Sequence, residues 1–424
     1  MMNRTLAQAD HEIARILSDE LERQKYTLML IPSENYASRA VMAAMGSIFT
    51  NKYAEGYPRK RYYNGCENYD KLEQLAIDRA NEIFRSEHAN VQLHTGSQAN
   101  MAAYYCLLEK GDRILGMSVA HGGHLTHGLD KNFSGQFYEG HFYGLNAESD
   151  RLDYDEIMEV AKQVRPKLIV CGASAYPRII DFQRFREIAD AVGAYLMADI
   201  AHIVGLVAAG SHPDPVPYCD MVTSTTHKTL RGPRGALILC KGKYADQLDR
   251  AVFPGVQAGP LMQVIAAKAV AFKEAQSFGF REYQRQIIRN AQFLAQSLLD
   301  EGFQLVTGGT DNHLMLVDLR NKNISGRDAA NMCEAAGIVA NKNLIPGDPA
   351  NPVETSGIRF GTPAMTTRGM KEEEMVQIGQ WIARVVHEGR AEDGSPNEAV
   401  LNEIAGQVRE LCEAFPIYED IDIN

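Results

Sequence analysis

Between residues 89 and 240, short apolar runs alternate with amphipathic stretches, and this alternation limits the possible folds more than any other feature of the chain. Six runs have the length and composition of buried strands: 89–93, 113–117, 167–172, 195–199, 221–225 and 236–240. Stretches with helical spacing lie between several of them: 98–108, 154–164 and 182–192. Such alternation predicts an α/β fold with a mainly parallel sheet that is covered by helices on both faces.

The pattern changes after residue 271. A long helical stretch at 281–299 is followed by further expected elements: strands at 303–306 and 313–319, and helices at 327–336, 371–387 and 397–414. Near the start, Ile13, Ile16, Leu17 and Leu21 follow the spacing of an amphipathic helix within residues 6–24. Because 424 residues exceed the usual size of a single core, we expect three parts. These are an N-terminal helical arm (1–48), a large domain (49–275) and a smaller α+β C-terminal domain (276–424).

Charge and cysteine usage narrow the class of protein. Lys and Arg total 43 against 54 Asp and Glu, a net charge of −11, which is no electrostatic footprint for nucleic acid or an anionic membrane. The seven cysteines are scattered and form no CxxC pair, as expected of free thiols in a reducing compartment. No secretory signal pattern opens the chain, and no apolar run approaches membrane-spanning length. We therefore expect a cytoplasmic protein without nucleic-acid or membrane partners.

A polar cluster, HTGSQAN at 94–100, directly follows the first expected strand and opens a helix. In an open α/β sheet, ligands lie beyond the carboxyl ends of the strands. Free backbone N–H groups at a helix start, a glycine that permits close approach and a serine hydroxyl together suit a phosphate group. Taken alone, the cluster is better explained by a helix N-cap at Thr95 or Ser97.

Two more clusters follow strand ends further along the chain. Asp199 ends the run at 195–199, where a carboxylate could pair with a protonated pyridine nitrogen or merely cap a turn. Lys228 follows the run at 221–225 among polar and cationic neighbours, and is either an amine that forms Schiff bases or a solvated lysine. Phosphate cradle, aspartate and lysine in this order fit one cofactor, pyridoxal 5'-phosphate (PLP). No P-loop or dinucleotide-binding glycine motif follows a strand.

Seven collinear blocks extend the pattern beyond these clusters: SENYAS (33–38), TNKYAEGYP (50–58), KRYYNG (60–65), AHGGHLTHG (120–128), GASAYPR (172–178), TSTTHKTLRGPRG (223–235) and SGIRFGTPA (356–364). In these blocks the chain resembles the serine hydroxymethyltransferase family over roughly residues 30–377. The resemblance implies the fold-type-I architecture of PLP-dependent transferases. It also implies reversible transfer of a one-carbon unit between serine and tetrahydrofolate, giving glycine and 5,10-methylenetetrahydrofolate.

The resemblance assigns roles around the cofactor ring. Lys228 is implied to be the lysine that binds the cofactor covalently, Asp199 to pair with the ring nitrogen, and His124 to stack on the ring. Thr225 and His227, neighbours of the lysine in its motif, are implied to be a catalytic and a cofactor-binding residue.

The phenolic and phosphate ends of the cofactor have their own implied contacts. Ser174 and His202 correspond to residues beside the phenolic oxygen. Thr95, Gly96 and Ser97 correspond to the phosphate-binding residues, so the resemblance favours the phosphate interpretation of the 94–100 cluster.

Other implied contacts come from a second subunit. By the resemblance, Tyr53 and the loop at 257–259, including Gly259, reach into the site of a neighbouring chain. The expected assembly is therefore a homodimer with shared active sites, and the sequence leaves open whether dimers pair into tetramers.

The amino acid and folate sites are assigned in the same way. Arg359 in SGIRFG corresponds to the residue that binds the substrate carboxylate, a planar pairing that a lysine would serve poorly. Ser33 and Tyr63 are further expected substrate contacts. Glu55 corresponds to the acid–base glutamate that handles the hydroxymethyl proton, and burial in a closed site should raise its pKa. Folate contacts are expected from Leu125 and Asn343. Without the flanking motifs, Arg359 and Glu55 would be interpreted as a surface ion pair and a solvated loop acid.

Three histidines, His121, His124 and His127, invite a metal interpretation. We expect no metal, because no cysteine or carboxylate near them in the sequence completes a ligand set and because a glycine-rich HGGH segment suits packing over a flat ring. One of these histidines could equally be a satisfied buried side chain.

Residues that differ from those usual in the family leave the substrate preference open. They occur at Pro32, Arg59, Thr95, Val119 and Ala258. An altered pocket wall could admit an α-substituted serine such as α-methylserine, with D-alanine as product. A folate-independent aldolase acting on β-hydroxy amino acids would use the same lysine and aspartate. A non-catalytic scaffold is the alternative outside enzymes, and the joint presence of Lys228, Asp199, Glu55 and Arg359 argues against it.

Overall fold

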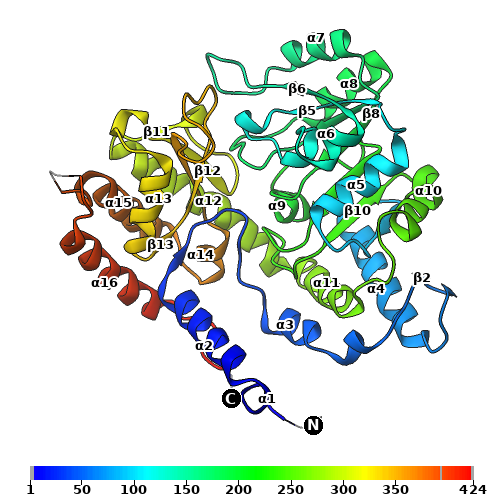
Figure 1. The fold of residues 1–424 in the computed structure, drawn as a ribbon, viewed down its shortest axis with the longest axis horizontal. Coiled ribbons are helices and arrows are strands. Elements are labelled where there is room, and N and C mark those ends of the chain that lie inside the picture. Colours follow the sequence, from blue (N-terminus) through cyan, green and yellow to red (C-terminus); the bar gives the residue numbers. More distant parts are fainter. Residues whose placement is uncertain (1–3, 392–393, 422–424) are drawn as a thin grey trace.

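A seven-stranded sheet forms the centre of the larger half of the molecule (Figure 1). The computed structural model describes residues 4–391 and 394–421. In spatial order the strands are β4 (His88–Asn90), β10 (Ala236–Cys240), β9 (Met221–Thr225), β8 (Tyr195–Asp199), β7 (Leu168–Cys171), β5 (Arg113–Met117) and β6 (Glu139–Tyr143). The strands from β9 to β6 are parallel, and β10 is antiparallel to both of its neighbours. The expected α/β class with a mainly parallel sheet is confirmed.

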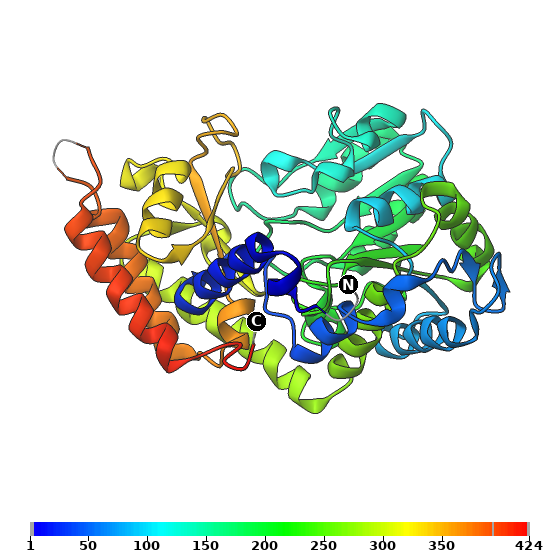
Figure 2. The same cartoon turned by 60° about the horizontal axis from the view of Figure 1, so that its bottom comes forward.

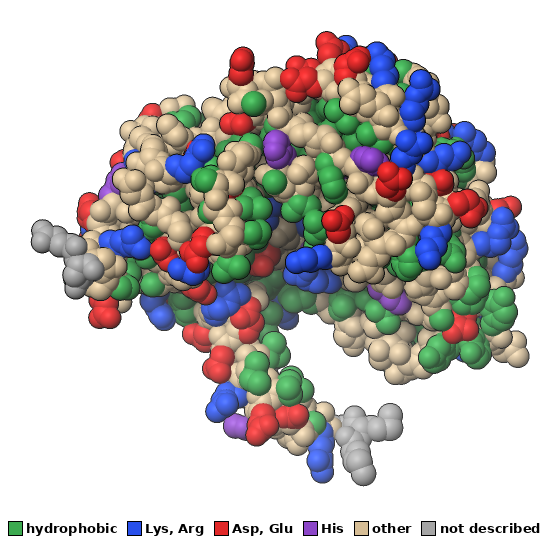
Figure 3. Space-filling model, turned by 45° about the horizontal axis from the view of Figure 1, so that its top comes forward, with side chains coloured by type: hydrophobic (Ala, Val, Ile, Leu, Met, Phe, Trp, Pro, Cys, Tyr) green, Lys and Arg blue, Asp and Glu red, His purple; other side chains and the backbone are tan. Residues whose placement is uncertain are grey.

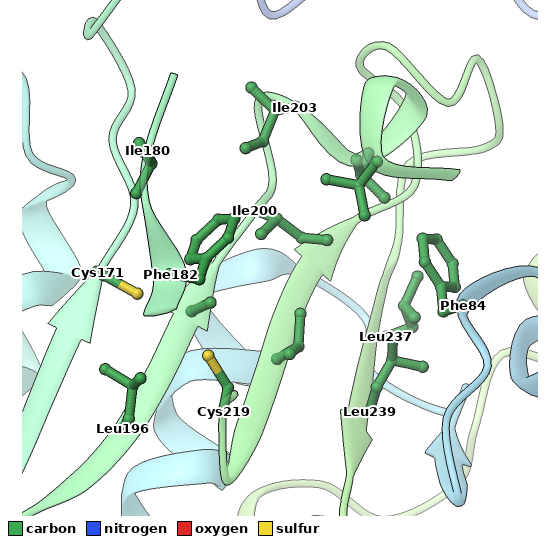
Figure 4. Close-up of a cluster of buried hydrophobic side chains, with 14 of the residues drawn as sticks. Phe84, Cys171, Ile180, Phe182, Leu196, Ile200, Ile203, Cys219, Leu237 and Leu239 are labelled. Atoms are coloured by element: carbon green, nitrogen blue, oxygen red, sulfur yellow. The ribbon is translucent and has the colours of Figure 1, made fainter. Parts of the chain in front are cut away.

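Helices cover both faces of this sheet because successive strand residues point to opposite sides. In β7, Ile169 and Cys171 join one buried cluster while Leu168 and Val170 join another. The first cluster is covered by α4 (Glu67–Phe84), α7 (Tyr154–Val164), α8 (Phe182–Val192) and α11 (Met262–Ala275). The second is covered by α5 (Gly96–Leu107) and α10 (Ala245–Arg250). Figure 4 shows part of the first cluster, where Phe84 and Phe182 pack over the strands that carry Leu196 and Leu237.

The smaller half is built on a four-stranded antiparallel sheet with a core of its own. Its strands, in spatial order, are β11 (Gln304–Leu305), β12 (Leu314–Asp318), β15 (Gly357–Gly361) and β14 (Asn341–Asn343). Its helices are α12 (Phe278–Asp300), α13 (Gly326–Ala335), α14 (Pro363–Thr367), α15 (Glu372–Glu388) and α16 (Glu398–Ala414). The two halves lie side by side (Figures 1 and 2).

The N-terminal segment runs from the smaller half to the larger one (Figure 2). It contains α1 (Leu6–Ala9), α2 (His11–Tyr26), β1 (Leu28–Met29), which pairs with β13 (Ile338–Val339), and α3 (Arg39–Met45). The sequence pattern predicted one helix here, but Asp10 ends α1 and caps α2 by accepting hydrogen bonds from the amides of Glu12 and Ile13.

The expected apolar stripe of this arm is not packed against its own chain. Ile13, Ile16 and Leu17 are 49%, 57% and 45% exposed. Figure 3 shows the arm standing out from the body with apolar side chains on its surface.

A buried arginine ties the base of the arm to the C-terminal helix. The Arg368 guanidinium donates hydrogen bonds to the carbonyls of Gln24, Lys25 and Thr27 at the end of α2, and to those of Cys412 and Phe415 at the end of α16. A cation at the carboxyl end of two helices is favoured by their dipoles. Arg368 therefore holds the arm through backbone carbonyls, with no carboxylate partner among the described residues.

Two sequence predictions about the large sheet need correction. The strand β6 was missed because it is an edge strand, half-exposed and polar (EGHFY), and so lacks an apolar run. The first expected strand, 89–93, is shorter than predicted, because β4 ends at Asn90. Among the described helices, none is both long enough and apolar enough to cross a lipid bilayer.

Candidate active site

The carboxyl edge of the parallel strands opens into a cavity of about 270 Å³. Ten of the sequence-predicted residues line it: Thr95, Gly96, Ser97, His124, Ser174, Asp199, His202, Thr225, His227 and Lys228. They come from the ends of β8 and β9 and the loops that follow β7, β8 and β9, from the start of α5 and the residue before it, and from the loop after β5. Because β10 is antiparallel, the start of this strand also reaches the same edge and brings Arg234 and Gly235 to the cavity.

At one end of the cavity, α5 begins at Gly96. Thr95 is its N-cap, and the Thr95 hydroxyl accepts a hydrogen bond from the Gln98 amide at 3.2 Å. A side chain on Gly96 would not fit, since its Cβ would lie 2.7 Å from Cγ2 of Thr225. The cap and the anion site are thus compatible: the cap orients the helix start, and the bare Gly96 leaves the backbone accessible to a phosphate.

Behind this end lies a lysine that the sequence did not single out. Lys268 on α11 is fully buried, and its ammonium donates to the carbonyls of Val91 (2.7 Å), Leu93 (2.9 Å) and Ala236 (2.7 Å). Burial lowers the pKa of Lys268 from 10.5 to about 7. These hydrogen bonds link the segment that leads into residues 94–97 to the start of β10, which follows Arg234.

Asp199 lies at the base of the cavity and is held as a carboxylate. It accepts hydrogen bonds from Asn100 Nδ2 (2.9 Å), His127 Nε2 (3.1 Å) and the Ala201 amide (3.1 Å). Burial alone would raise the pKa of Asp199, but the hydrogen bonds and charge interactions with His127, His124 and Asn100 outweigh it and lower this pKa well below its ordinary value. An ionised carboxylate of this kind can pair with a protonated ring nitrogen.

Lys228 has the environment of an activated amine. Its Nζ donates to the Thr225 hydroxyl at 3.1 Å. Burial lowers the pKa of Lys228 from 10.5 to about 8; the Asp199 charge opposes this shift, and the nearby Arg359 and Arg234 charges add to it. With this pKa, about a tenth of the amine is unprotonated and nucleophilic at pH 7, far more than for an ordinary lysine.

His124 lies over the same cavity as a neutral ring. Burial lowers its pKa from 6.5 to about 4. Its Nδ1 accepts from the Thr126 amide at 3.3 Å. A neutral aromatic ring in this place can stack on a flat ligand.

The prediction that no carboxylate lies near these histidines is wrong. Although no carboxylate lies near the histidines in the sequence, the fold brings Asp199 to His124 and His127, with candidate ligand atoms within 4.8 Å of one another. The contact joins the loop after β5 to the end of β8, and such proximity cannot be read from sequence spacing. His127 is the buried, satisfied histidine, since its Nδ1 faces the His124 amide and its Nε2 donates to Asp199.

Arg359 in β15 reaches the cavity region from the small sheet. It is buried, one terminal nitrogen donates to the Ser174 carbonyl, and the other lies 3.4 Å from Asn341 Oδ1. Its Nε has no hydrogen-bond partner in the part of the chain that the structure describes. Burial lowers the pKa of Arg359 from 12.5 to about 10. A buried guanidinium without an ion pair among the described residues is a ready receptor for a carboxylate.

A second group of expected residues lies outside this cavity. The Tyr53 and Tyr63 rings pack together with centroids 5.7 Å apart, next to the hairpin of β2 (Gly56–Tyr57) and β3 (Lys60–Arg61). Gly259 packs against this group, since its Cβ would lie 3.0 Å from the Tyr53 ring and 3.9 Å from Glu55 Cγ. Tyr53 and Tyr63 are 65% and 46% exposed, and Glu55 is partly exposed.

Three further expected residues are also outside the cavity of their own chain. Ser33 lines a neighbouring hollow of about 470 Å³ between the arm and the body, which shares His227 and Arg234 with the cavity. Leu125 is 42% exposed, and the Asn343 side chain donates to the carbonyl of Leu344.

Sequence reasoning missed several residues of the cavity wall: His94, Asn100, His127 and Arg234. Each lies within a motif that was quoted, and the available signal was a polar residue inside an apolar helix or beside an expected site residue. Asn100, for example, is a buried amide on α5 that donates to Asp199 and accepts from Thr223.

A family model described as serine hydroxymethyltransferase matches residues 6–382 of the chain. The matched region contains every residue of the cavity wall and also the Tyr53, Glu55 and Gly259 group.

Proposed function

Because the chain belongs to the serine hydroxymethyltransferase family, we propose that the cavity described above is its PLP site and that Lys228 is the lysine that binds the cofactor. The chain is a PLP-dependent transferase that uses tetrahydrofolate as co-substrate and interconverts serine and glycine. The observation that carries the assignment of Lys228 is its amine, with a pKa lowered to about 8, in one cavity with the ionised Asp199.

The residues of the cavity fit the cofactor. The start of α5 with the bare Gly96 suits the phosphate, and the ionised Asp199 suits a protonated ring nitrogen. His227 Nδ1 is buried without a partner among the described residues, which suits a site that a polar ligand completes. When bound, the cofactor supplies an electron sink that stabilises negative charge at the substrate α-carbon.

The protein's own groups then have distinct tasks. Lys228 supplies an amine of lowered pKa beside the Thr225 hydroxyl. Arg359 binds the substrate carboxylate and so orients the bonds at the α-carbon. Asp199 keeps its negative charge because Asn100 and His127 donate to it. Glu55 moves the proton of the hydroxymethyl group, and Leu125 and Asn343 contact the folate.

Borohydride labelling tests the central assignment. The purified protein should be yellow, and sodium borohydride should bleach it and leave a pyridoxyl group on the peptide that contains Lys228. The Lys268→Met variant is the matched control, because Lys268 is a second buried lysine near the site and should not affect which peptide is labelled. A label on any lysine other than Lys228 would refute the assignment.

We further propose that two copies of the chain share their active sites. The Tyr53, Glu55 and Gly259 group lies outside its own cavity and is partly exposed, as expected if it completes the cavity of a second copy. The exposed apolar stripe of α2 supplies additional surface for the same partner.

Complementation tests this sharing. Lys228→Ala and Glu55→Gln chains should each be inactive alone, whereas chains refolded together should regain up to about a quarter of the wild-type activity. The reason is that half of a random mixture of dimers is mixed, and each mixed dimer has one intact site of two. If both groups of a site came from one chain, no activity would return.

The preferred amino acid follows from one comparison of rates. We propose that serine is preferred over α-methylserine, and the assay offers each of them with and without tetrahydrofolate. Fast turnover of α-methylserine would favour the α-substituted substrate, and cleavage independent of folate would favour an aldolase.

We also propose that the arm, large and small domains span residues 1–48, 49–275 and 276–424. The separate cores of the two sheets support this division, although Leu28 and Leu30 of the arm pack into the small core. A cytoplasmic location is proposed from the seven cysteines, all of them free and buried. Limited proteolysis and imaging of a tagged chain test these two proposals.

A further inference from the structure

A pair of buried histidines connects the two halves of the molecule beside the cavity. His202, in the turn after β8, lines the cavity, and its Nδ1 lies 3.3 Å from Nε2 of His313. His313 precedes β12 of the small sheet and is not part of the cavity wall. Both rings are buried, and their centroids are 5.5 Å apart.

The contact between the two rings holds one proton. Burial, together with the charges of Lys228 and Arg359, lowers the pKa of His202 well below 6.5 and that of His313 to about 3. Each ring is therefore neutral near pH 7 and offers one donor and one acceptor. Either His313 Nε2–H donates to His202 Nδ1, or His202 Nδ1–H donates to His313 Nε2.

The unpaired nitrogen of His313 decides between these two arrangements. His313 Nδ1 is buried and has no hydrogen-bond partner among the described residues. If His202 were the donor, the His313 proton would sit on Nδ1 as a buried N–H without an acceptor, the rarer and costlier kind of unsatisfied group. If His313 Nε2–H is the donor, only a lone pair is left unpaired. The arrangement in which His313 Nε2–H donates to His202 Nδ1 is therefore favoured.

The position of His313 is fixed by contacts of its own segment with the large half. Thr310 Oγ1 donates to the Pro177 carbonyl at 3.2 Å, and Asn312 Nδ2 donates to the Tyr176 carbonyl at 3.0 Å. Asp311 forms an ion pair with Arg178 at 2.8 Å. The 310–313 segment therefore holds the His313 ring against His202.

We infer that His313 is a positioning residue that fixes His202 in the Nε2–H form, so that this wall of the cavity offers a donor to an anionic oxygen. With Nδ1 of His202 accepting from His313, the His202 proton must lie on Nε2. The phenolic oxygen of the cofactor is such an anion, and the inference rests on the proposed cofactor site for the identity of that oxygen. The tautomer itself does not depend on that proposal.

Ring-nitrogen NMR of the cofactor-free protein tests the tautomer directly. The two ring ¹⁵N shifts of each histidine distinguish a protonated from an unprotonated nitrogen, and the His202 signals among the twelve histidines are identified by their loss in His202→Asn. The expected wild-type result is a protonated Nε2 and an unprotonated Nδ1 on His202. A protonated Nδ1 overturns the inference, and this measurement needs no other variant.

Two variants of His313 separate positioning from packing. In His313→Gln the side-chain amide can still donate to His202, whereas His313→Leu fills the space without a donor. In the leucine variant, the Nε2–H tautomer should no longer be the single state of His202. In the glutamine variant, it should remain the single state. An unchanged His202 tautomer in the leucine variant refutes the role of His313.

Cofactor affinity supplies the functional readout. Loss of one hydrogen bond to a charged oxygen, about 1.5 kcal/mol, should raise the dissociation constant of PLP about tenfold in His313→Leu and little in His313→Gln. Equal weakening in both variants would assign His313 a packing role only. Borohydride labelling of Lys228 is followed in parallel, because failure there refutes the cofactor site and leaves the tautomer result standing.

Discussion

Replacing Arg359 by methionine should remove substrate binding while leaving the fold intact. The structure leaves Nε and one weakly bound terminal nitrogen of Arg359 free to form a two-pronged contact with a carboxylate. Two charge-assisted hydrogen bonds, at about 1.5–3 kcal/mol each, amount to about 3–6 kcal/mol. Since about 1.4 kcal/mol corresponds to a factor of ten, KM for serine should rise by about 10² to 10⁴.

The effect of this replacement on stability should be small. Burial lowers the pKa of Arg359 to about 10, so the charged guanidinium is disfavoured where it lies, and an apolar side chain of similar length removes that cost. The matched control is Arg368→Met, which removes a second buried guanidinium, one bonded to five backbone carbonyls at the ends of α2 and α16. That variant should unfold at a markedly lower temperature and keep the wild-type KM.

Steady-state kinetics with serine and thermal unfolding followed by circular dichroism measure both quantities on the same preparations. Arg359→Lys is a useful intermediate, because a lysine retains the charge but not the planar pair of donors. Its KM should lie between those of the wild-type protein and Arg359→Met. If KM for serine is unchanged in Arg359→Met, or if Arg359→Met and Arg368→Met behave alike, the carboxylate role of Arg359 is wrong.

Three further predictions concern single side chains. Glu55→Gln should retain PLP and glycine binding but lower folate-dependent serine cleavage by about 10² or more; equal loss of all three, measured by absorbance and turnover, would contradict its acid–base role. Asp199→Asn should retain a covalently bound cofactor yet lose most activity at every pH from 5 to 9, because the low pKa of Asp199 keeps the wild-type residue ionised throughout; a variant as active as wild type at low pH would contradict this. For Lys268, the folded pKa of about 7 lies below the unfolded value of 10.5, so the unfolded chain binds more protons in this window and wild-type stability should rise with pH between about 7 and 10.5. Lys268→Met should lack this rise in unfolding midpoint, and parallel pH curves for the two proteins would refute it.

The sheet and the residues at its edge were largely predictable from sequence. The strand β10 is apolar and buried throughout, and β5 is apolar and buried after Arg113, so their bounds follow directly from the composition. Polar residues directly after such strands must lie at the carboxyl edge, which is why Asp199 and Lys228 were found to share a cavity.

The remaining features depend on contacts between distant segments. The polar edge strand β6 carries no apolar signal, and the buried ammonium of Lys268 looks, in sequence, like any lysine on a helix. His313 meets His202 across 111 positions, and no local pattern encodes such a contact. The exposed stripe of α2 has the helical spacing expected of a packed face, yet spacing alone does not say which molecule covers it.

The reversed direction of β10 means that Lys228 is carried on a hairpin. Strands β9 and β10 pair directly, from Thr225 with Ala236 to Met221 with Cys240, and the ten residues between them include Lys228 and Arg234. The hairpin is therefore one contiguous segment of twenty residues, 221–240, that could be replaced as a unit by the corresponding hairpin of a related protein. A change in the length of its loop would move the amine relative to Asp199 without altering the parallel strands, so loop length offers a way to adjust the reach of the lysine by protein engineering.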